Sequence, residues 1–552
     1  MNPPSNFRRY LPYVMIILAY VAGMFVDIME IDAAQYATMA RDMLRENEFL
    51  KLYDRGRDYL DKPPLTFWMT ILSFKVFGYT TWAYKLPSVL FSLVAIWGTE
   101  KLTSLLYNNR TAQFAGLILA SSQAFFLMNN DIKTDMYMIA PMIVATWLLV
   151  KSTRGGSGKF SAWKDVALGG LALGVGMLAK GPIVVVAAAM ALGGDLLLRR
   201  EWRQILHWKW LLIIPGIILV TLPFDIGLYQ QYGWKGVEFF YWTQSFGRVT
   251  GESEWTNDAT AFFFVHTFAW SFLPWTLLFL GALFYRLKKI IQAGFTVPSV
   301  AEAVSLSGFI LVFTALCFSR FKLPHYIFVT YPFAAILSAG FLMELYEFQL
   351  LQGWKRFFIR AYQVIWVLAF LFAAFLIFFA FPEAHILPKI IFALLGILLT
   401  VDAFRTKDEW VRFLWPTVLG FALCNLAFNI SMYPQILDFQ TTGVAGKYIQ
   451  ESQLEGDVFA FQKSGRALDF YSGNVAKPIE DFGKLESKSK AETFILYTDA
   501  DGFQQIQNAN IKHEILMKRL HNPPNRLSIT FINPSTRSGS LGFRYLLRIP
   551  KQ

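Results

Sequence analysis

Residues 361–381, AYQVIWVLAFLFAAFLIFFAF, contain no charged side chain. A helix needs about 20 apolar residues to cross a bilayer core, so this stretch predicts a membrane-spanning helix. Similar apolar stretches occur at 10–28, 82–105, 112–128, 136–152, 165–180, 182–198, 210–227, 261–284, 303–319, 327–346, 388–402 and 413–432. Together they predict a mostly α, polytopic membrane protein with about thirteen transmembrane helices.

The overall composition agrees with a membrane protein. The chain has 552 residues, of which 55% are hydrophobic, 17% aromatic and only 16% charged. Soluble globular domains average about 25% charged residues, so the composition excludes a water-soluble protein of several domains. It also excludes a disordered chain, which would need low hydrophobicity and high net charge.

The net charge of +12 bears on how the chain is oriented in the membrane and does not indicate that it binds nucleic acid. If the N-terminus lies in the cytoplasm, the short loops richest in Lys and Arg also fall on the cytoplasmic side, as the positive-inside rule requires. Their cations include Lys151, Arg154, Arg199, Arg200, Arg286, Lys289, Lys355 and Arg405. An odd number of spans then places the residues after 432 on the outer side of the membrane.

The last part of the chain has a different pattern. Short apolar runs predict buried strands, and a polar segment between them predicts a helix at 502–508. The predicted strands are 458–461, 493–497, 527–531 and 543–547. We therefore predict a transmembrane domain over residues 1–432 and a soluble outer α/β domain over residues 433–552, which is an ordinary domain size.

The first outer loop, residues 29–81, is too long to be a simple connector. Its first part predicts an amphipathic interfacial helix, with Met39 on the apolar side and Arg41 on the polar side. Asp32 stands at the start of this helix, at the outer mouth of the first span. The alternative is that Asp32 only interacts favourably with the helix dipole.

A second carboxylate, Asp135, directly precedes the apolar run 136–152 and could serve only as a helix cap. It falls on the same side and at the same membrane depth as Asp32, where we expect a polar cavity. Cations on the translocated side run against the insertion bias, and the alternative for each is a snorkelling side chain. They are Lys62, Lys235, Arg248, Arg320 and Lys322. Two acids and several cations around one vestibule suit an anionic substrate held in the headgroup layer.

Five short motifs occur in order along the chain: Glu30–Ala37, Lys62-Pro63-Pro64, Lys133–Met136, Leu178–Pro182 and Lys322–Tyr326. They resemble the motifs of GT-C superfamily glycosyltransferases that use polyprenyl-phosphate sugars. The resemblance is strongest to the bacterial aminoarabinose transferase of lipid A modification and to protein O-mannosyltransferases. It implies an enzyme of the bacterial inner membrane, with a cytoplasmic N-terminus and a periplasmic C-terminal domain.

The resemblance also implies a reaction. A sugar would pass from a polyprenyl phosphate such as undecaprenyl phosphate to lipid A, a glycan or a protein hydroxyl, with inversion as in a single displacement. Asp32 and Asp135 would be catalytic, with Asp32 as the base. Lys62, Arg248 and Lys322 would bind the donor phosphate. The substrate or lipid path would be lined by Gln35, Tyr36, Gln244, His325 and Tyr326, although aromatic side chains at this depth also suit an interfacial belt.

This chain departs from the motifs at some positions. The acidic pair of the family is Asp32-Ala33 here, and the following Arg is Gln35. In the aminoarabinose branch a Glu precedes Lys-Pro-Pro and a His lies in the aromatic loop, where this chain has Asp61 and Gln244. These departures leave the donor sugar open. The residues require no cofactor, and a divalent metal ion stays an open alternative.

Two other classes of protein fit parts of the sequence. A secondary transporter would use ionisable groups near the bilayer midplane, such as Lys180 and Asp225. A scaffold would use the C-terminal segment to bind an outer partner. The transporter class predicts repeated halves, which the sequence lacks, and the scaffold leaves the outer-loop charges without a role.

Overall fold

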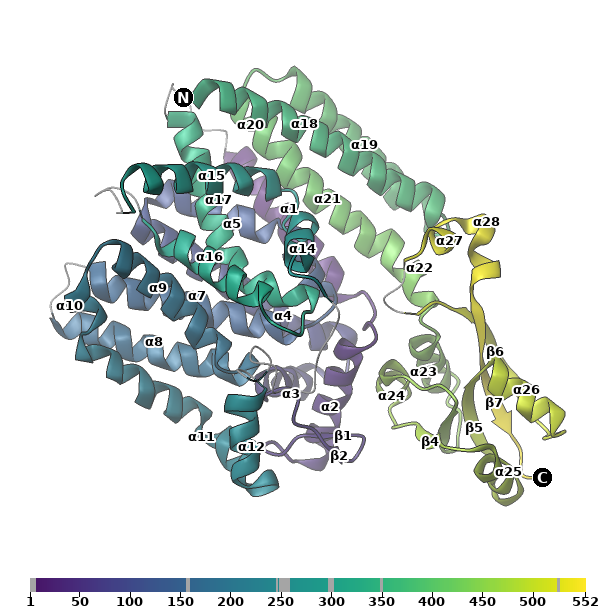
Figure 1. Cartoon of the computed structure of the whole chain (residues 1–552). Helices are drawn as coiled ribbons and strands as arrows, with labels where there is room; N and C mark the ends of the chain where they lie inside the picture. The colour runs from purple at the N-terminus through teal and green to yellow at the C-terminus, as the bar shows by residue number, and fades with distance from the viewer. Residues whose placement is uncertain are drawn as a thin grey trace.

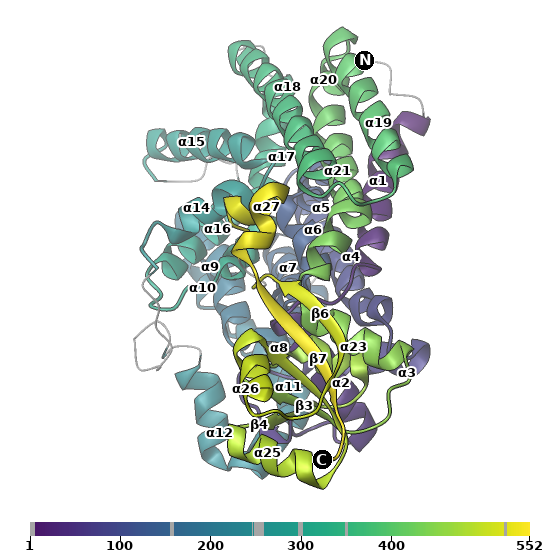
Figure 2. The same cartoon turned by 90° about the vertical axis from the view of Figure 1, so that its right-hand side faces the viewer.

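The computed structural model describes residues 6–154, 159–244, 247, 259–295, 302–347, 351–523 and 527–552. Helices make up most of them. In Figure 1 the helices form one large body, and the C-terminal strands form a smaller part beside it. Figure 2, turned by 90°, shows the sheet facing the viewer below α27 (Ile529–Ile532).

Within the described residues, eight helical segments are long and apolar enough to cross a membrane. Single helices account for Thr81–Leu106 (α4), Thr134–Arg154 (α7), Phe160–Lys180 (in α8, Lys159–Lys180) and Ile386–Arg405 (α19). Successive helices make up Trp202–Tyr232 (α10, Trp202–Ile205; η1, Trp208–Leu212; α11, Ile213–Tyr232) and Pro324–Glu347 (η3, Pro324–Thr330; α17, Tyr331–Glu347). The same is true of Gln352–Ala380 (α18, Gln352–Phe375; η5, Leu376–Ala380) and Arg412–Asp438 (α20, Glu409–Leu414; η6, Trp415–Leu419; α21, Gly420–Ala427; η7, Phe428–Met432; α22, Tyr433–Asp438). The protein is therefore a multi-pass membrane protein.

Two further apolar segments, each predicted as one span, are bent. Residues 112–128 are divided between α5 (Asn109–Ala120) and α6 (Gln123–Asn130), which meet at 51°. Residues 261–284 are divided between α14 (Phe263–Ser271) and α15 (Thr276–Gln292), which meet at 120°. The cause in the first pair lies at the junction, where the hydroxyls of Ser121 and Ser122 donate to carbonyls of α5.

Four shorter apolar helices complete the body. They are α1 (Asn6–Met24), α3 (Leu65–Phe77), α9 (Ile183–Leu198) and α16 (Val304–Cys317). If each bent pair is one span, the described residues contain up to ten long spans in addition to these four. The number thirteen therefore stays a prediction.

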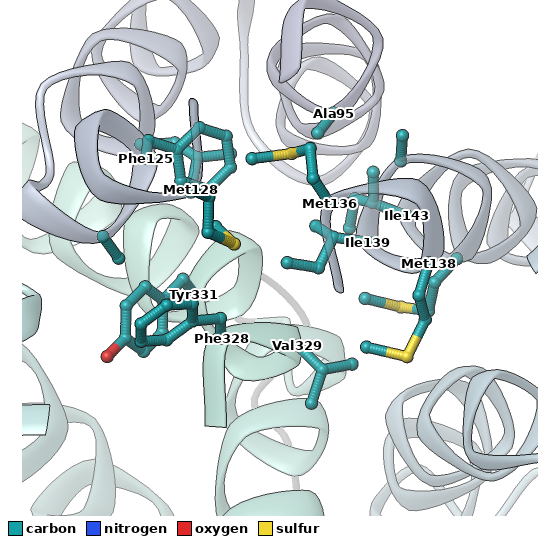
Figure 3. Packing of buried hydrophobic residues seen from close by; sticks show 14 of the residues in the cluster. Ala95, Phe125, Met128, Met136, Met138, Ile139, Ile143, Phe328, Val329 and Tyr331 are labelled. Carbon is teal, nitrogen blue, oxygen red and sulfur yellow. The ribbon is translucent and has the colours of Figure 1, made fainter. Parts of the chain in front are cut away.

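The centre of the helical body is packed with aliphatic, aromatic and methionine side chains. Figure 3 shows Met136, Met138 and Ile139 of α7 facing Met128 of α6 and Val329 of η3. All five are buried. These side chains follow Asp135 directly, so the carboxylate at the start of α7 is carried on a rigid helix.

Residues 29–81, the predicted first outer loop, contain a helix, a short hairpin and the start of α3. The helix α2 (Asp32–Glu46) begins at Asp32, as predicted, and ends where Asn47 adopts a left-handed conformation at φ 56°. A two-stranded hairpin follows, with β1 (Tyr53–Asp54) paired antiparallel with β2 (Arg57–Asp58). Pro64 then precedes α3, as the Lys-Pro-Pro turn predicts.

Arg41, on the polar side of α2, is buried in the structure and only 1% exposed. Its side chain is covered by α24 (Arg466–Ser472), a helix of the C-terminal segment. Helical periodicity identifies which residues share a face, but it does not say that another part of the chain covers that face.

The C-terminal residues form a five-stranded sheet in the order β4-β3-β5-β7-β6. Its strands are β3 (Val458–Phe461), β4 (Lys477–Ile479), β5 (Phe494–Asp499), β6 (Glu514–His521) and β7 (Gly542–Ile549). The first three are parallel, and β7 pairs antiparallel with β5 and β6. The helices of this part are α23 (Thr441–Glu451), α24, α25 (Phe482–Ala491), α26 (Ala500–Asn508), α27, α28 (Pro534–Arg537) and the short η8 (Ser538–Ser540).

Most of the predicted C-terminal elements are present: β3, β5, β7 and α26 match. The strand predicted at 527–531 is wrong, because Ser528 caps the helix α27 by accepting a hydrogen bond from the amide of Phe531. Phe531 is buried against Phe381 and Phe439. The strand β6 was not predicted, since it is rich in charged residues and partly exposed.

Candidate active site

The first cluster of charged side chains joins α2 to the segment before α7. The ammonium of Lys133 lies 3.0 Å from Oδ2 of Asp32 and 3.2 Å from Oδ2 of Asp131. Asp32 is the first residue of α2, and its side chain is 38% exposed. Lys133 thus holds two carboxylates from different parts of the chain and leaves Asp32 accessible.

The electrostatics of this cluster follow from its burial and its mixed charge. Burial raises the pKa of the Asp131 carboxyl, and the nearby ammonium of Lys133 opposes this rise. Burial lowers the pKa of Lys133, but Asp131 and Asp32 together outweigh it, and the net shift in pKa is upward. Lys133 therefore stays protonated, and the cluster keeps a fixed positive charge beside Asp32.

The second cluster surrounds Asp135, which is completely buried. Its Oδ1 accepts a hydrogen bond of 2.5 Å from Lys180, the last residue of α8. Its Oδ2 lies 3.8 Å from Nε2 of His325 and accepts no hydrogen bond within the described part of the chain. The ammonium of Lys180 also lies 4.2 Å from the ring centroid of Tyr326. Among the residues that the structure describes, this buried carboxylate oxygen is thus left without a hydrogen-bond donor.

The third cluster lies at the Lys-Pro-Pro turn. The ammonium of Lys62 is 2.6 Å from Oδ2 of Asp61, and Nε2 of Gln244 is 3.0 Å from Oδ1 of the same residue. The amide of Gln244 also donates to the main-chain oxygen of Asp61. The turn is therefore bound to the segment that follows the π-helix η2 (Phe239–Thr243), after the short helix α12 (Trp234–Glu238).

These residues do not fit a metal ion. One carboxylate oxygen of Asp61 already accepts the amide N–H of Gln244, and the other lies on an ammonium. No group of three His, Cys, Asp or Glu side chains that could hold a metal occurs in residues 6–154, 159–244, 247, 259–295, 302–347, 351–523 and 527–552.

The three clusters adjoin one another. His325 lies within electrostatic range of Lys180, Lys133 and Lys62, one cation from each cluster. Tyr59 lies within range of both Asp61 and Asp32. Burial first, and then these two carboxylates, raise the pKa of the Tyr59 hydroxyl well above its ordinary value, so it stays a neutral donor.

The other predicted residues lie at varied places. Gln35 donates a 2.9 Å hydrogen bond to Asp54 of the hairpin. Tyr36 is buried, with its ring packed edge-on against Phe67. Lys322 is also buried, and its ammonium donates to the main-chain oxygen of Ala259. Arg248 lies outside the described residues.

The structure brings together Asp32, Asp135, Lys62, His325 and Tyr326. Sequence reasoning gave Lys133 and Lys180 no role in a transferase site, although both stand inside the quoted motifs. The signal that could have identified Lys133 is its position two residues before Asp135 in the sequence. Lys180 has no acidic neighbour in its motif, so only the fold reveals its pairing with Asp135. Asp225, the other residue that favoured a transporter, hydrogen-bonds Thr221 and Tyr241 at 2.8 Å each.

Comparisons with known proteins show which families this chain is similar to. Residues 61–225 match the family model described as dolichyl-phosphate-mannose-protein mannosyltransferase. The undecaprenyl phosphate-alpha-4-amino-4-deoxy-L-arabinose arabinosyl transferase of Edwardsiella ictaluri is 25% identical over 60% of this chain and 59% of its own. The corresponding protein of Pseudomonas aeruginosa strain LESB58 is 26% identical over 57% of this chain and 56% of its own. The resemblance to polyprenyl-phosphate glycosyltransferases is confirmed.

The fold agrees over nearly the full length. The crystal structure of ArnT from Cupriavidus metallidurans bound to undecaprenyl phosphate has a TM-score of 0.76 and covers 99% of this chain and 98% of its own, at 16% identity. The apo crystal structure of the same protein has a TM-score of 0.74 and the same coverage, at 15% identity. The chain therefore has the ArnT-like fold. In sequence it spans 54% to 59% of the length of the first curated relatives it matches.

Proposed function

We propose that the protein is an integral membrane glycosyltransferase. It transfers a sugar from a polyprenyl phosphate, such as undecaprenyl phosphate, to lipid A, a glycan or a protein hydroxyl. The observation that carries this proposal is the meeting of Asp32, Asp135 and Lys62 from three separate segments, with His325 in range of three lysines. The similarity to arabinosyl transferases supports it.

The leaving group needs cations more than it needs an acid. When the bond from the sugar to the phosphate oxygen breaks, the polyprenyl phosphate leaves as an anion. A preorganised positive charge stabilises that anion as it forms. Lys62 fills this role, with Arg248 and Lys322 as further phosphate-binding residues. Asp61 holds the Lys62 ammonium in place until the phosphate arrives.

The acceptor hydroxyl needs a base. The Asp32 carboxylate is accessible beside Lys133, so it accepts the proton as the hydroxyl oxygen attacks the sugar. Oδ2 of Asp135 accepts no hydrogen bond from the described residues. In this proposal it accepts one from a hydroxyl group of the acceptor or the sugar and so orients that group. Attack from the face opposite the phosphate inverts the anomeric centre. An acceptor that is itself a phosphate is already ionised, and Asp32 then only positions it.

Lys62 lies in a narrow crevice between residues 50–62 and α11. The lining of the crevice is mixed: the polar Tyr59 and Gln231 lie beside the apolar Leu50, Leu52, Leu60, Phe224 and Leu228. Gln35, Tyr36, Gln244, His325 and Tyr326 line the path of sugar and lipid in this proposal.

The proposal includes a topology. The chain crosses the bacterial inner membrane thirteen times, with the N-terminus in the cytoplasm and the active site on the periplasmic face. Residues 1–432 form the transmembrane catalytic domain, and residues 433–552 form the periplasmic α/β domain. The cytoplasmic loops carry most of the surplus positive charge, as the insertion bias requires.

A donor-turnover experiment tests the proposal. The purified full-length protein in lipid nanodiscs receives lipid A and undecaprenyl phosphate that carries 4-amino-4-deoxy-L-arabinose or, in a second arm, mannose. Mass spectrometry follows the release of undecaprenyl phosphate and the modified lipid A. We expect release with at least one donor and a loss of about 100-fold or more in Asp32→Asn, as general-base catalysis predicts.

The matched control is Glu46→Gln, an exposed carboxylate at the other end of the same helix, which should keep the wild-type rate. Normal turnover by Asp32→Asn would remove Asp32 from the reaction. If either donor crossed the membrane of sealed vesicles with its sugar still attached, the protein would be a transporter and the proposed enzyme activity would be wrong.

A further inference from the structure

The C-terminal segment and the first outer loop are joined by a buried cation. The guanidinium of Arg41 in α2 donates to the main-chain oxygens of Asp469 at 2.6 Å and Phe470 at 3.3 Å, both in α24. Arg45, one turn further along α2, donates to the oxygen of Gly473 just after α24. Cations near the last carbonyls of a helix are favourable. Arg41 and Arg45 therefore bind the C-terminal end of α24.

The other end of α24 is capped by a residue of the outer loop. The carboxylate of Glu30 accepts hydrogen bonds from the amide of Ala467 at 2.8 Å and from the amide of Arg466 at 3.3 Å. It also accepts one from the hydroxyl of Thr442 at 2.8 Å. The helix begins after Gly465, which has no side chain to cap it. A Cβ atom on Gly465 would overlap Glu30, so glycine permits this approach.

Two reciprocal ion pairs join the tip of the hairpin to α24. Asp54 of the tip pairs with Arg466, and Arg55 donates from Nε to Oδ2 of Asp469 at 2.7 Å. Arg55 and Gly56 both adopt left-handed conformations, at φ 53° and 72°, which form the tight tip. Asp469 is completely buried, so loss of Arg55 would leave its charge without its closest cation.

The same hairpin contacts the first turns of the helix that carries Asp32. Oδ2 of Asp54, which pairs with Arg466, also accepts the 2.9 Å hydrogen bond from Gln35. Gln35 lies three residues after Asp32, so the two side chains are neighbours on one helix face. Lys133 holds the carboxylate of Asp32 itself, at 3.0 Å. The start of α2 is thus fixed between Lys133 and the chain Gln35–Asp54–Arg466.

We propose that the C-terminal segment positions the base of the reaction. Arg466 and Glu30 are positioning residues: they fix the hairpin and the start of α2, and through them the carboxylate of Asp32. This inference rests on the proposed function. It gives the C-terminal segment a role in the chemical step, because a displacement of about 1 Å at a reacting group can lower a rate about 100-fold.

The test uses Arg466→Met and Asp54→Asn in the full-length protein in nanodiscs. We expect kcat to fall about 10- to 100-fold with KM for the lipid-linked donor within about twofold, because Lys62 and its surroundings are unchanged. The double variant should lose no more of kcat than the worse single variant, because each substitution removes the same ion pair between Arg466 and Asp54. Hydrogen exchange of the amides of residues 33–40 should become faster in all three.

The matched control is the exposed ion pair between Lys477 and Asp457 in the same C-terminal segment, with 2.5 Å between Nζ and Oδ2. Lys477→Met and Asp457→Asn should leave kcat and the exchange of α2 at wild-type values. Faster exchange of α2 in Arg466→Met with an unchanged kcat would overturn the proposal. So would a rise in KM with kcat preserved. If Asp32→Asn is fully active, the proposed function fails; if Asp32→Asn is inactive but Arg466→Met is normal, only this inference fails.

Discussion

The ammonium of Lys133 lies 3.0 Å from the carboxylate of Asp32, although 101 positions separate the two residues in the chain. The same ammonium holds Asp131 at 3.2 Å. One lysine therefore separates two carboxylates that would otherwise repel each other. It also fixes the proposed base at the start of α2.

Replacement of Lys133 tests this arrangement. Lys133→Gln should lower the transfer rate about 10- to 100-fold, because Asp32 loses the partner that orients it and gains an unscreened neighbour in Asp131. The double variant Lys133→Gln/Asp131→Asn removes the repulsion. We expect it to regain thermal stability without regaining the rate. Recovery of the full rate in the double variant would show that Lys133 only balances charge.

Lys62 should act on the leaving phosphate. Lys62→Ala should lower kcat about 100-fold or more, the loss seen when one stabilising donor of a developing anion is removed. Lys62→Arg keeps the charge and should retain more activity than Lys62→Ala. Steady-state kinetics of undecaprenyl phosphate release give both values. Equal rates for Lys62→Ala and the wild-type protein would contradict the role.

Lys180 and Asp135 should be coupled in stability. Asp135 is completely buried, so Lys180→Met leaves an unpaired carboxylate and should lower the unfolding free energy by about 3–5 kcal/mol. Lys180→Met/Asp135→Asn removes both charges and should be more stable than Lys180→Met. Thermal unfolding in nanodiscs compares the three proteins. Additive losses in the double variant would show that the two side chains are energetically independent.

The sequence predicts the helical body well, because a membrane span is a local property of apolar length. The start of α2 at Asp32 and the turn before α3 were also readable from local signals. The bends between α5 and α6 and between α14 and α15 were not, since they depend on local hydrogen bonds and packing within apolar runs.

The candidate site also combines residues that local motifs predict with contacts that only the fold reveals. Motifs identified Asp32, Asp135 and Lys62, but a sequence cannot say which cation pairs with which acid. Lys133 and Lys180 were therefore missed as partners. Arg41 and the hairpin contacts to α24 depend on segments more than 400 residues apart in the chain, as the separation of 428 between Arg41 and Asp469 shows. No periodicity or spacing carries that information.

Glu30 makes the contact between the outer loop and α24 dependent on pH. Burial raises the pKa of its carboxyl above the ordinary value of 4.5, and the amides of Ala467 and Arg466 only partly offset this. The folded protein therefore binds the proton more tightly than the unfolded chain does. The stability that this group contributes is fully present below its unfolded pKa and is lost as pH rises through the folded pKa.

We expect wild-type protein to lose stability relative to Glu30→Gln as pH rises from 4 into the range above the folded pKa of Glu30. Glutamine keeps an oxygen for the amides of α24 and cannot ionise, so the difference between the two proteins isolates this one carboxyl. Melting temperatures measured in nanodiscs across this range give the comparison, with the exposed Glu455→Gln as the control that should follow the wild-type curve. A difference between wild type and Glu30→Gln that stays constant with pH would mean that Glu30 is ionised equally in the folded and unfolded states. Its burial against α24 would then have no electrostatic cost.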